Sequence, residues 1–322
     1  MRRLSTGKIP IDVLNSTFLR LTGAGSPDIV TPPLAGLDFA AVKVGRRFMI
    51  VSADPVTGVV ENIGRYAISV NANDVATSGN RPQFAESVVL LPEGADARYA
   101  RKIAQQMDAE ARRLGISILG GHTEVTPGLA RPIIAVTAFS FVDRYVSSRD
   151  AREGDTIMMT KSAGLEGTAV LAGSPKFLEH ISVVDEAVTA CDTGFVHAMH
   201  DCTEGGVLGA VFEMSVASRL GFELQEKAVP VAPETQAICR KLSIDPLRLI
   251  GSGSLLLSVG KGAESEVVRA LRPFCRVTRI GEFHRGRRVM LTREGGEKVV
   301  KEAPEDELWR VLARSAGRGH GL

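Results

Sequence analysis

The pattern of apolar and polar positions predicts alternating strands and helices in the first half of the chain. Continuous apolar or alternating stretches predict strands at residues 37–44, 47–53, 84–91, 116–119 and 133–142. Helical spacing predicts helices at residues 11–21, 63–78 and 96–114. The last is the clearest, because Asp96 can cap its start and Gly115 can stop it. The Gly- and Pro-rich stretch 22–33 predicts a mobile loop.

A second unit begins where the composition shifts, near Ser147–Asp150. We therefore predict two domains, at residues 1–148 and 149–322. In the second unit the pattern predicts helices at 165–172, 207–219 and 234–242, and strands at 255–259, 277–282 and 289–292. This order of elements predicts an α/β or α+β fold in each half. The Gly-rich residues 315–322 are expected to fray.

The amino-acid composition argues against several classes of protein. The 322 residues carry a net charge of +2 and no basic block with interleaved aromatic residues, which argues against nucleic-acid binding. No run of eighteen apolar residues predicts a membrane span, and no apolar stretch after Met1 predicts a signal peptide. The four cysteines form no C-x-x-C pair, so we expect reduced thiols in a cytoplasmic protein.

Four acidic or amide residues are the main candidates for chemistry: Asp38, Asp54, Asn73 and Asp74. Each lies inside an apolar segment or at its edge, where a carboxylate is costly unless it is paired, hydrogen-bonded or bound to a metal. Their number suggests one shared site, and hard oxygen ligands suit Mg²⁺. The alternative for any single aspartate is a local turn or helix cap.

A glycine-rich loop is predicted at Gly120-Gly121-His122-Thr123-Glu124, after a strand. Its glycines would let the backbone approach a ligand closely. His122 is a candidate for proton transfer or phosphate binding, and Glu124 for orienting Mg²⁺ or substrate. The alternatives are an ordinary hydrogen-bonded histidine and a solvated glutamate.

A second anion site is predicted at the turn before residue 207. Backbone N–H groups at a helix start favour anions, so Thr203, Gly205 and Gly206 are candidates for phosphate contact. Cys202 has no base that the sequence identifies, and the nearby histidines lack a convincing fourth metal ligand. The loop 23–28 could cover phosphates or be a plain linker, and Lys8 could reach a phosphate or be solvated.

Five segments, in order along the chain, resemble motifs of the aminoimidazole-ribonucleotide synthetase superfamily. They are Val51-Ser52-Ala53-Asp54-Pro55, the helix from Ile63-Gly64-Arg65 to Asn73-Asp74-Val75-Ala76-Thr77-Ser78-Gly79, Ile118-Leu119-Gly120-Gly121-His122-Thr123-Glu124-Val125, Ala198–Val207 and Ile250–Leu255. The resemblance implies a two-domain PurM-like fold, ATP and Mg²⁺ as cofactors, and a homodimer paired through N-terminal sheets. It also implies that Asp38, Asp54 and Asp74 bind the metal.

Within the superfamily, the segments Gly7–Pro10 and Gly36–Val42 most resemble HypE-like hydrogenase-maturation proteins. That resemblance implies an ATP-dependent enzyme that activates an amide-type oxygen or phosphorylates a small-molecule or protein acceptor. HypE proteins carry a carbamoyl group on a cysteine in their tail, whereas the last cysteine of this sequence is Cys275. The alternatives are a small-molecule kinase or cyclo-ligase, and a nucleotide-binding regulatory protein without turnover.

Overall fold

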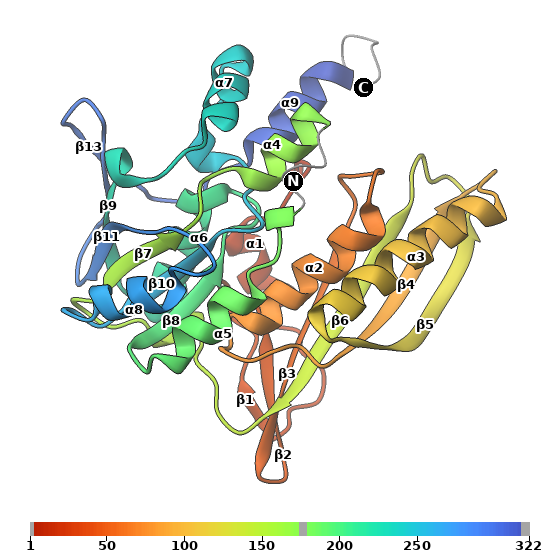
Figure 1. Ribbon diagram of the computed structural model, residues 1–322, viewed down its shortest axis with the longest axis horizontal. Coiled ribbons are helices and arrows are strands. Elements are labelled where there is room, and N and C mark those ends of the chain that lie inside the picture. Colours follow the sequence, from red (N-terminus) through yellow and green to blue (C-terminus); the bar gives the residue numbers. More distant parts are fainter. Residues whose placement is uncertain (1–2, 174–178, 317–322) are drawn as a thin grey trace.

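The computed structural model describes residues 3–173 and 179–316, which form two mixed α/β domains side by side (Figure 1). This architecture confirms the predicted fold class. The first domain contains a six-stranded sheet in the order β1-β2-β3-β6-β4-β5. Its strands are β1 (Ile29–Thr31), β2 (Ala40–Val44), β3 (Arg47–Val56), β4 (Phe84–Pro92), β5 (Ser117–Thr126) and β6 (Ile133–Val142). Its helices are α1 (Ile11–Ser16), α2 (Ile63–Ala76) and α3 (Ala97–Leu114).

The second domain contains a seven-stranded sheet in the order β13-β12-β9-β11-β7-β10-β8. Its strands are β7 (Thr156–Thr160), β8 (Val196–Asp201), β9 (Gly221–Gln225), β10 (Leu255–Val259), β11 (Val277–His284), β12 (Arg288–Leu291) and β13 (Glu297–Val299). Its helices are α4 (Leu165–Ala172), α5 (Val184–Asp192), α6 (Gly206–Ser218), α7 (Pro233–Leu242), α8 (Glu264–Leu271) and α9 (Glu307–Ala316). The predicted boundary after residue 148 falls within a short 3₁₀ helix, Ser148–Asp150, between the two sheets.

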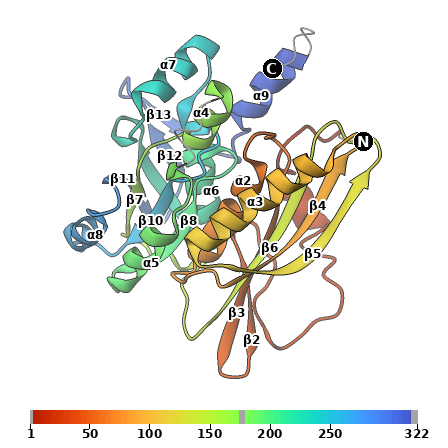
Figure 2. The same cartoon turned by 45° about the vertical axis from the view of Figure 1, so that its right-hand side comes forward.

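Helix α2 is buried on nearly all sides because it packs against the first sheet, α3 and the second domain (Figure 2). Small residues permit this close packing. A Cβ atom added at Gly64 would lie 2.6 Å from the carbonyl oxygen of Ile103 in α3. The amphipathic α3 begins as predicted, since Asp96 accepts a hydrogen bond of 2.8 Å from the Tyr99 N–H.

The two domains share one apolar core. Ile63, Ile68 and Ala72 of α2 belong to the same buried cluster as Val184 of α5 and Met199 of β8. The hydrophobic surface that stabilises each domain is therefore partly supplied by the other.

The largest error of the sequence prediction is the loop at residues 120–124, which is the middle of a ten-residue strand, β5. The strand pairs in parallel with β4, with a bulge opposite Ala85 and Glu86. Gly121 accommodates close contact with β4, and the two glycines do not end the strand. Strand β1 lies inside the predicted loop 22–33, and residues 317–322 of the predicted frayed end lie outside the described residues. The pattern also missed α5, β8, β9, α8, β13 and α9. None of the helices in the described part of the chain is long and apolar enough to span a membrane.

Candidate active site

Four aspartates from both domains converge where the two domains meet. Asp54 lies on β3, Asp74 near the end of α2, Asp38 just before β2, and Asp201 at the end of β8. Ligand atoms of Asp38, Asp201 and the adjacent His200 all lie within 4.8 Å of one another. The structure thus brings together the three predicted metal ligands, Asp38, Asp54 and Asp74, and adds Asp201. We call these four aspartates the acid cluster.

The acid cluster is held by hydrogen bonds from neighbouring elements. The Ser52 hydroxyl donates to Asp74 at 2.8 Å. The Asn71 side chain accepts from the Asp54 backbone N–H at 2.7 Å and donates to the Asp54 carbonyl at 3.1 Å. These contacts tie the end of β3 to α2 and fix the two carboxylates relative to each other.

The electrostatics of the acid cluster favour a bound cation. Burial raises the pKa of Asp74 well above its ordinary value, and the carboxylates of Asp201, Asp54 and Asp38 raise it further. Burial and the Asp38 carboxylate likewise raise the pKa of Asp201. The Asp201 Oδ2 atom is buried and has no hydrogen-bond partner within the described residues. Mg²⁺ prefers carboxylate oxygens as ligands, and the acid cluster offers four carboxylates, of which the Asp201 Oδ2 atom has no hydrogen-bond partner among the described residues.

A chain of alternating charges borders the acid cluster. His200 forms an ion pair with Asp38 through Nδ1 and lies 3.1 Å from Glu213 through Nε2. Glu213 in turn lies 3.0 Å from the Lys8 ammonium. Burial lowers the pKa of His200, but Asp38 and Glu213 outweigh burial and raise this pKa to about 10. The His200 ring thus lies between Asp38 of the first domain and Glu213 of α6.

His122 and Glu124 lie apart from the acid cluster of their own chain. They pair with each other at 3.1 Å on the exposed edge strand β5, together with Gly120 and Gly121. Across the sheet, His122 of β5 pairs with Val88 of β4, Val88 pairs with Ala135 of β6, and Ala135 pairs with Pro55 of β3, the residue after Asp54. Three strand spacings separate the backbones of His122 and Pro55, which corresponds to about 14 Å. Within one chain, the four residues of this predicted loop do not contribute to the acid cluster.

Asn73 has a different set of contacts from those predicted. Its amide nitrogen donates to the Ile181 carbonyl at 2.8 Å, and its amide oxygen accepts from the Val183 N–H at 2.9 Å. Both polar atoms of this buried side chain thus tie α2 to the second domain. A role for Asn73 in binding metal or nucleotide stays a prediction.

A backbone N–H group at the start of α6 already donates a hydrogen bond to a carboxylate of the same chain. The Gly205 N–H donates to Asp306 at 2.7 Å, and the Thr203 hydroxyl faces Lys8 at 3.5 Å. Gly206 is packed tightly, because an added Cβ would lie 2.6 Å from the Leu247 carbonyl oxygen. A phosphate at Gly205 or Gly206 would have to compete with Asp306, a residue whose position before α9 the sequence did not reveal.

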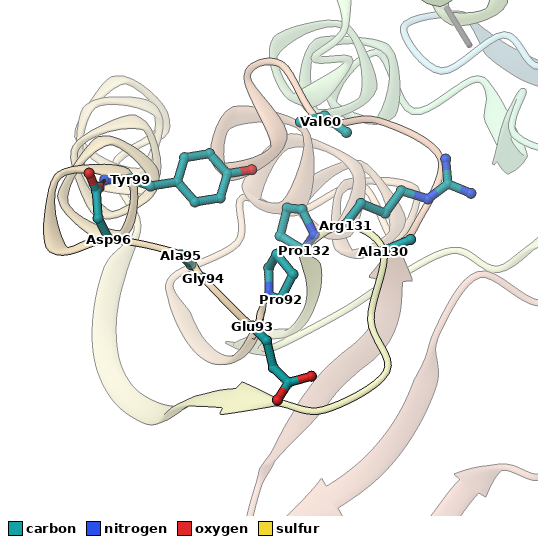
Figure 3. A pocket seen from close by; sticks show the side chains of 10 residues that line it. All are labelled: Val60, Pro92, Glu93, Gly94, Ala95, Asp96, Tyr99, Ala130, Arg131 and Pro132. Carbon is teal, nitrogen blue, oxygen red and sulfur yellow. Dashed lines mark hydrogen bonds between the residues drawn. The ribbon is translucent and has the colours of Figure 1, made fainter. Parts of the chain in front are cut away.

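A separate cavity of about 430 Å³ opens in the first domain, next to the loop that follows β3. Figure 3 shows Tyr99, Pro132, Val60 and the Arg131 side chain among the residues that line this cavity. Glu93 belongs to the same lining. This cavity contains none of the residues of the acid cluster.

The fold and the acid cluster together define a two-domain PurM-like protein with a group of carboxylates where its domains meet. The chain belongs to the AIR synthase related family. Residues 36–142 match the N-terminal domain of that family, and residues 152–294 match its C-terminal domain.

The sequence is similar to proteins named for hydrogenase expression or maturation. A putative hydrogenase expression/formation protein of Methanocaldococcus jannaschii is 27% identical over 250 residues, covering 73% of this chain and 75% of the relative. Carbamoyl dehydratase HypE of Escherichia coli is 29% identical over 233 residues, or 68% of each chain. A crystal structure of the maturation protein HypE in complex with ATP matches with a TM-score of 0.72 at 24% identity, covering 95% of this chain and 98% of the other.

Proposed function

We propose that this protein is a Mg²⁺- and ATP-dependent enzyme that activates an amide-type oxygen, with a carbamoyl group as the acceptor class. The observation that carries the proposal is the acid cluster at the meeting point of the domains, whose Asp201 Oδ2 has no hydrogen-bond partner among residues 3–173 and 179–316. Relatives named carbamoyl dehydratase support the acceptor class. The HypE structure with ATP, which shares the fold, supports the nucleotide.

The chain's own residues would bind the nucleotide through a metal and direct the reaction. Asp38, Asp54, Asp74 and Asp201 would hold Mg²⁺, which neutralises phosphate charge and polarises the γ-phosphoryl group when it is bound. The side chain of Lys8 is 48% exposed and its ammonium lies 3.0 Å from Glu213, next to His200, where it could contact a phosphate beside the acid cluster. Its pairing with Glu213 holds it there until the phosphate arrives.

The proposed reaction is phosphoryl transfer to the acceptor oxygen. That oxygen forms a bond to the γ-phosphorus while the bond from the γ-phosphorus to the β,γ-bridging oxygen breaks and ADP leaves. The amide nitrogen then releases a proton to solvent, which leaves an O-phosphorylated imidate with a neutral nitrogen and a negatively charged phosphate. The acid cluster would contribute mainly by position and charge, as is usual for phosphoryl transfer.

The test is ADP release from ATP and Mg²⁺, measured with and without carbamoyl compounds. We expect a carbamoyl acceptor to stimulate ADP release by the native protein, and Asp74→Asn to abolish the stimulated rate. Stimulation only by phosphate-accepting alcohols would favour the kinase alternative. ATP binding with no release under any condition would favour a regulatory protein without turnover.

We also propose that the protein is a cytoplasmic homodimer that pairs through its first-domain sheet. Strand β2 is already paired on both sides, by β1 and β3, so the two edges of the sheet are the three-residue β1 and the ten-residue β5. The long edge that needs cover is β5. Three large aliphatic side chains of β5 are exposed, namely Ile118, Leu119 and Val125. A long exposed edge of this kind is typically paired or protected. Four unpaired cysteines agree with a reducing compartment.

A further inference from the structure

A cavity of about 420 Å³ lies in the second domain, and none of the four aspartates of the acid cluster lines it. It opens between α7, the 3₁₀ turn Glu226–Ala228 that follows β9, and the turn that joins β12 to β13. Figure 1 shows α7 and β13 on the side of the second domain away from α3 and β5 of the first domain. We call this cavity the α7 pocket, and its polar lining consists of Glu226, Gln236, Arg240, Ser243, Asp245 and Arg293. Its volume lies in the range of small-molecule sites.

The two carboxylates of the α7 pocket already have partners within the chain. Glu226 accepts hydrogen bonds from the backbone N–H and from the Nε of Arg293, both at 3.1 Å. Asp245 accepts from the Leu247 N–H at 2.9 Å and so caps the 3₁₀ helix Pro246–Arg248. The lining therefore uses its acceptors largely inside the protein, and a ligand meets mainly N–H and O–H donors.

Arg240 differs from the other arginines of this region, because it lacks a carboxylate partner. It lies in the last turn of α7, and its Nε donates a hydrogen bond of 3.3 Å to the Gln236 carbonyl one turn earlier. Arg248, Arg293 and Arg310 each pair with a glutamate, whereas Arg240 forms no ion pair within residues 3–173 and 179–316. A guanidinium can donate two parallel N–H bonds to a carboxylate or phosphate. The pocket thus offers a guanidinium that is available to an anionic group.

Ser243 adds a hydroxyl donor close to Arg240 in the chain. It ends α7 with a left-handed backbone, at a φ of 54°, and its N–H donates to the Arg240 carbonyl at 3.3 Å. Its own carbonyl accepts a hydrogen bond of 3.0 Å from Arg310. These bonds hold Ser243 next to the last turn of α7 before any ligand binds, which lowers the cost of ordering the site.

The rest of the lining is apolar. Ile244 is 8% exposed and Cys239 is 3% exposed, and Val231 and Pro246 also line the cavity. Burial raises the pKa of Cys239 to about 11, so its thiol is neutral at pH 7. Such a lining favours contact with carbon atoms, which a hydrated inorganic ion does not supply.

We propose that the α7 pocket binds a small organic anion, whose phosphate or carboxylate group pairs with Arg240 and whose carbon skeleton contacts Ile244 and Pro246. The two arginines and two carboxylates of the lining carry no net charge, so general attraction of anions contributes little. Affinity instead depends on the Arg240 N–H groups and on apolar contact, which together select an anion with a carbon skeleton. Binding here needs neither Mg²⁺ nor the acid cluster, so this site is additional to the proposed function.

Ligand-observed NMR titrations of the full chain, in buffer without Mg²⁺, test the proposal. Phenyl phosphate and benzoate carry the two oxyanion groups on the same ring, benzyl alcohol is a neutral analogue, and inorganic phosphate lacks a carbon skeleton. We expect saturable binding of phenyl phosphate, of benzoate or of both, and the tighter of the two identifies the preferred group. Benzyl alcohol and inorganic phosphate should each bind at least about tenfold more weakly.

Two charge-matched variants locate the binding. Arg240→Gln should weaken binding of the tighter probe about tenfold, because a charge-assisted hydrogen bond is lost. Lys241→Gln removes the same charge from the next residue of α7, which lies outside the pocket lining, and should change the affinity less than about twofold. Both side chains are exposed, so both variants should fold as the native protein does.

Glu226→Gln should change the affinity in the opposite direction. It removes a negative charge from the lining and releases Arg293 from its ion pair, so the tighter probe should bind about threefold more tightly. A role of Glu226 in packing alone does not predict this gain, and an unchanged or weaker affinity would contradict recognition of an anion in the pocket.

The remaining outcomes separate this site from the acid cluster. Absence of saturable binding for both oxyanion probes contradicts the site, and equal losses in Arg240→Gln and Lys241→Gln would show that overall charge binds the anion. Benzyl alcohol as tight as the oxyanions contradicts recognition of charge, and inorganic phosphate as tight contradicts a role for the apolar lining. Mg²⁺-dependent ATP binding should be the same in Arg240→Gln as in the native protein, so a native protein that binds no ATP would contradict the proposed function alone.

Discussion

At the scale of single residues, the sequence located the carboxylates of the acid cluster better than it located their partners. Asp54 and Asp74 stood out because aspartate is expensive among apolar neighbours, and the structure places both in the acid cluster. Asp201 lies just before the turn that the sequence analysis identified ahead of residue 207. The neighbouring sequence, however, does not distinguish a metal-binding aspartate from one that caps a helix. The role of Asp201 depends on the pairing of β8 with β10, a contact between residues far apart in the chain.

The shifted pKa of Glu166 predicts a pH-dependent cost to stability. This pKa rises from an ordinary 4.5 to about 7 in the folded protein, so the folded state binds more protons than the unfolded state between these values. Stability should therefore fall as the pH rises through this window, by up to about 3 kcal/mol. Glu166→Gln should remove this loss and gain stability over the native protein at about pH 8, but much less at about pH 5.

Urea unfolding of both proteins at the two pH values measures the effect. The exposed Glu302→Gln serves as a control and should track the native protein. Equal stability differences at both pH values would show that Glu166 ionises normally in the folded state.

At the scale of elements, the periodicity of apolar residues identified the long helices, but the sequence analysis placed the end of a strand wrongly where two glycines occur. The sequence predicted α2 and α3 because each carries ten or more residues of consistent pattern. It ended β5 too early, because two consecutive glycines usually mark a turn. In the structure an added Cβ at Gly121 would lie on the Ser87 carbonyl oxygen, so glycine is needed there for strand packing. This reason involves β4, which a local pattern cannot reveal.

The exposed edge of β5 predicts that a single charge will separate the proposed dimer. Leu119 is 55% exposed on this strand, and Leu119→Lys would place a charge in a paired edge. We expect the variant to be monomeric by light scattering at micromolar concentration while the native protein is dimeric. Leu21→Lys, at a position 79% exposed outside the sheets, should remain dimeric. A monomeric native protein, or a dimeric Leu119→Lys variant, contradicts the proposed interface.

At the scale of the whole molecule, the two domains share one buried core around α2. The sequence indicated two α/β units, but it did not show that they share a core, because the shared contacts join residues more than one hundred positions apart. The same interface positions Asp201 and His200 of the second domain against Asp38 of the first. Stability and the proposed chemistry therefore depend on the same interface.

The shared core predicts a single cooperative unfolding transition. Trp309 is the one tryptophan of the sequence, so its fluorescence reports on the second domain, whereas far-UV circular dichroism reports on both. The two urea transitions should coincide in the native protein. Asn73→Ala leaves two buried backbone groups of the second domain unpaired, which should cost about 2 kcal/mol or more. Separate transitions in the native protein would contradict a shared core.

Calorimetric titration of ATP with and without Mg²⁺ tests the central claim most directly, since it measures whether the acid cluster binds a metal-bound nucleotide. We expect binding that requires Mg²⁺ and that weakens at least about tenfold in Asp54→Asn and in Asp74→Asn. Both variants should stay folded, because each removes a carboxylate from a group of like charges. Asp143→Asn, at a side chain 87% exposed, should bind as the native protein does. Affinity that is independent of Mg²⁺, or unchanged in both cluster variants, would contradict the account.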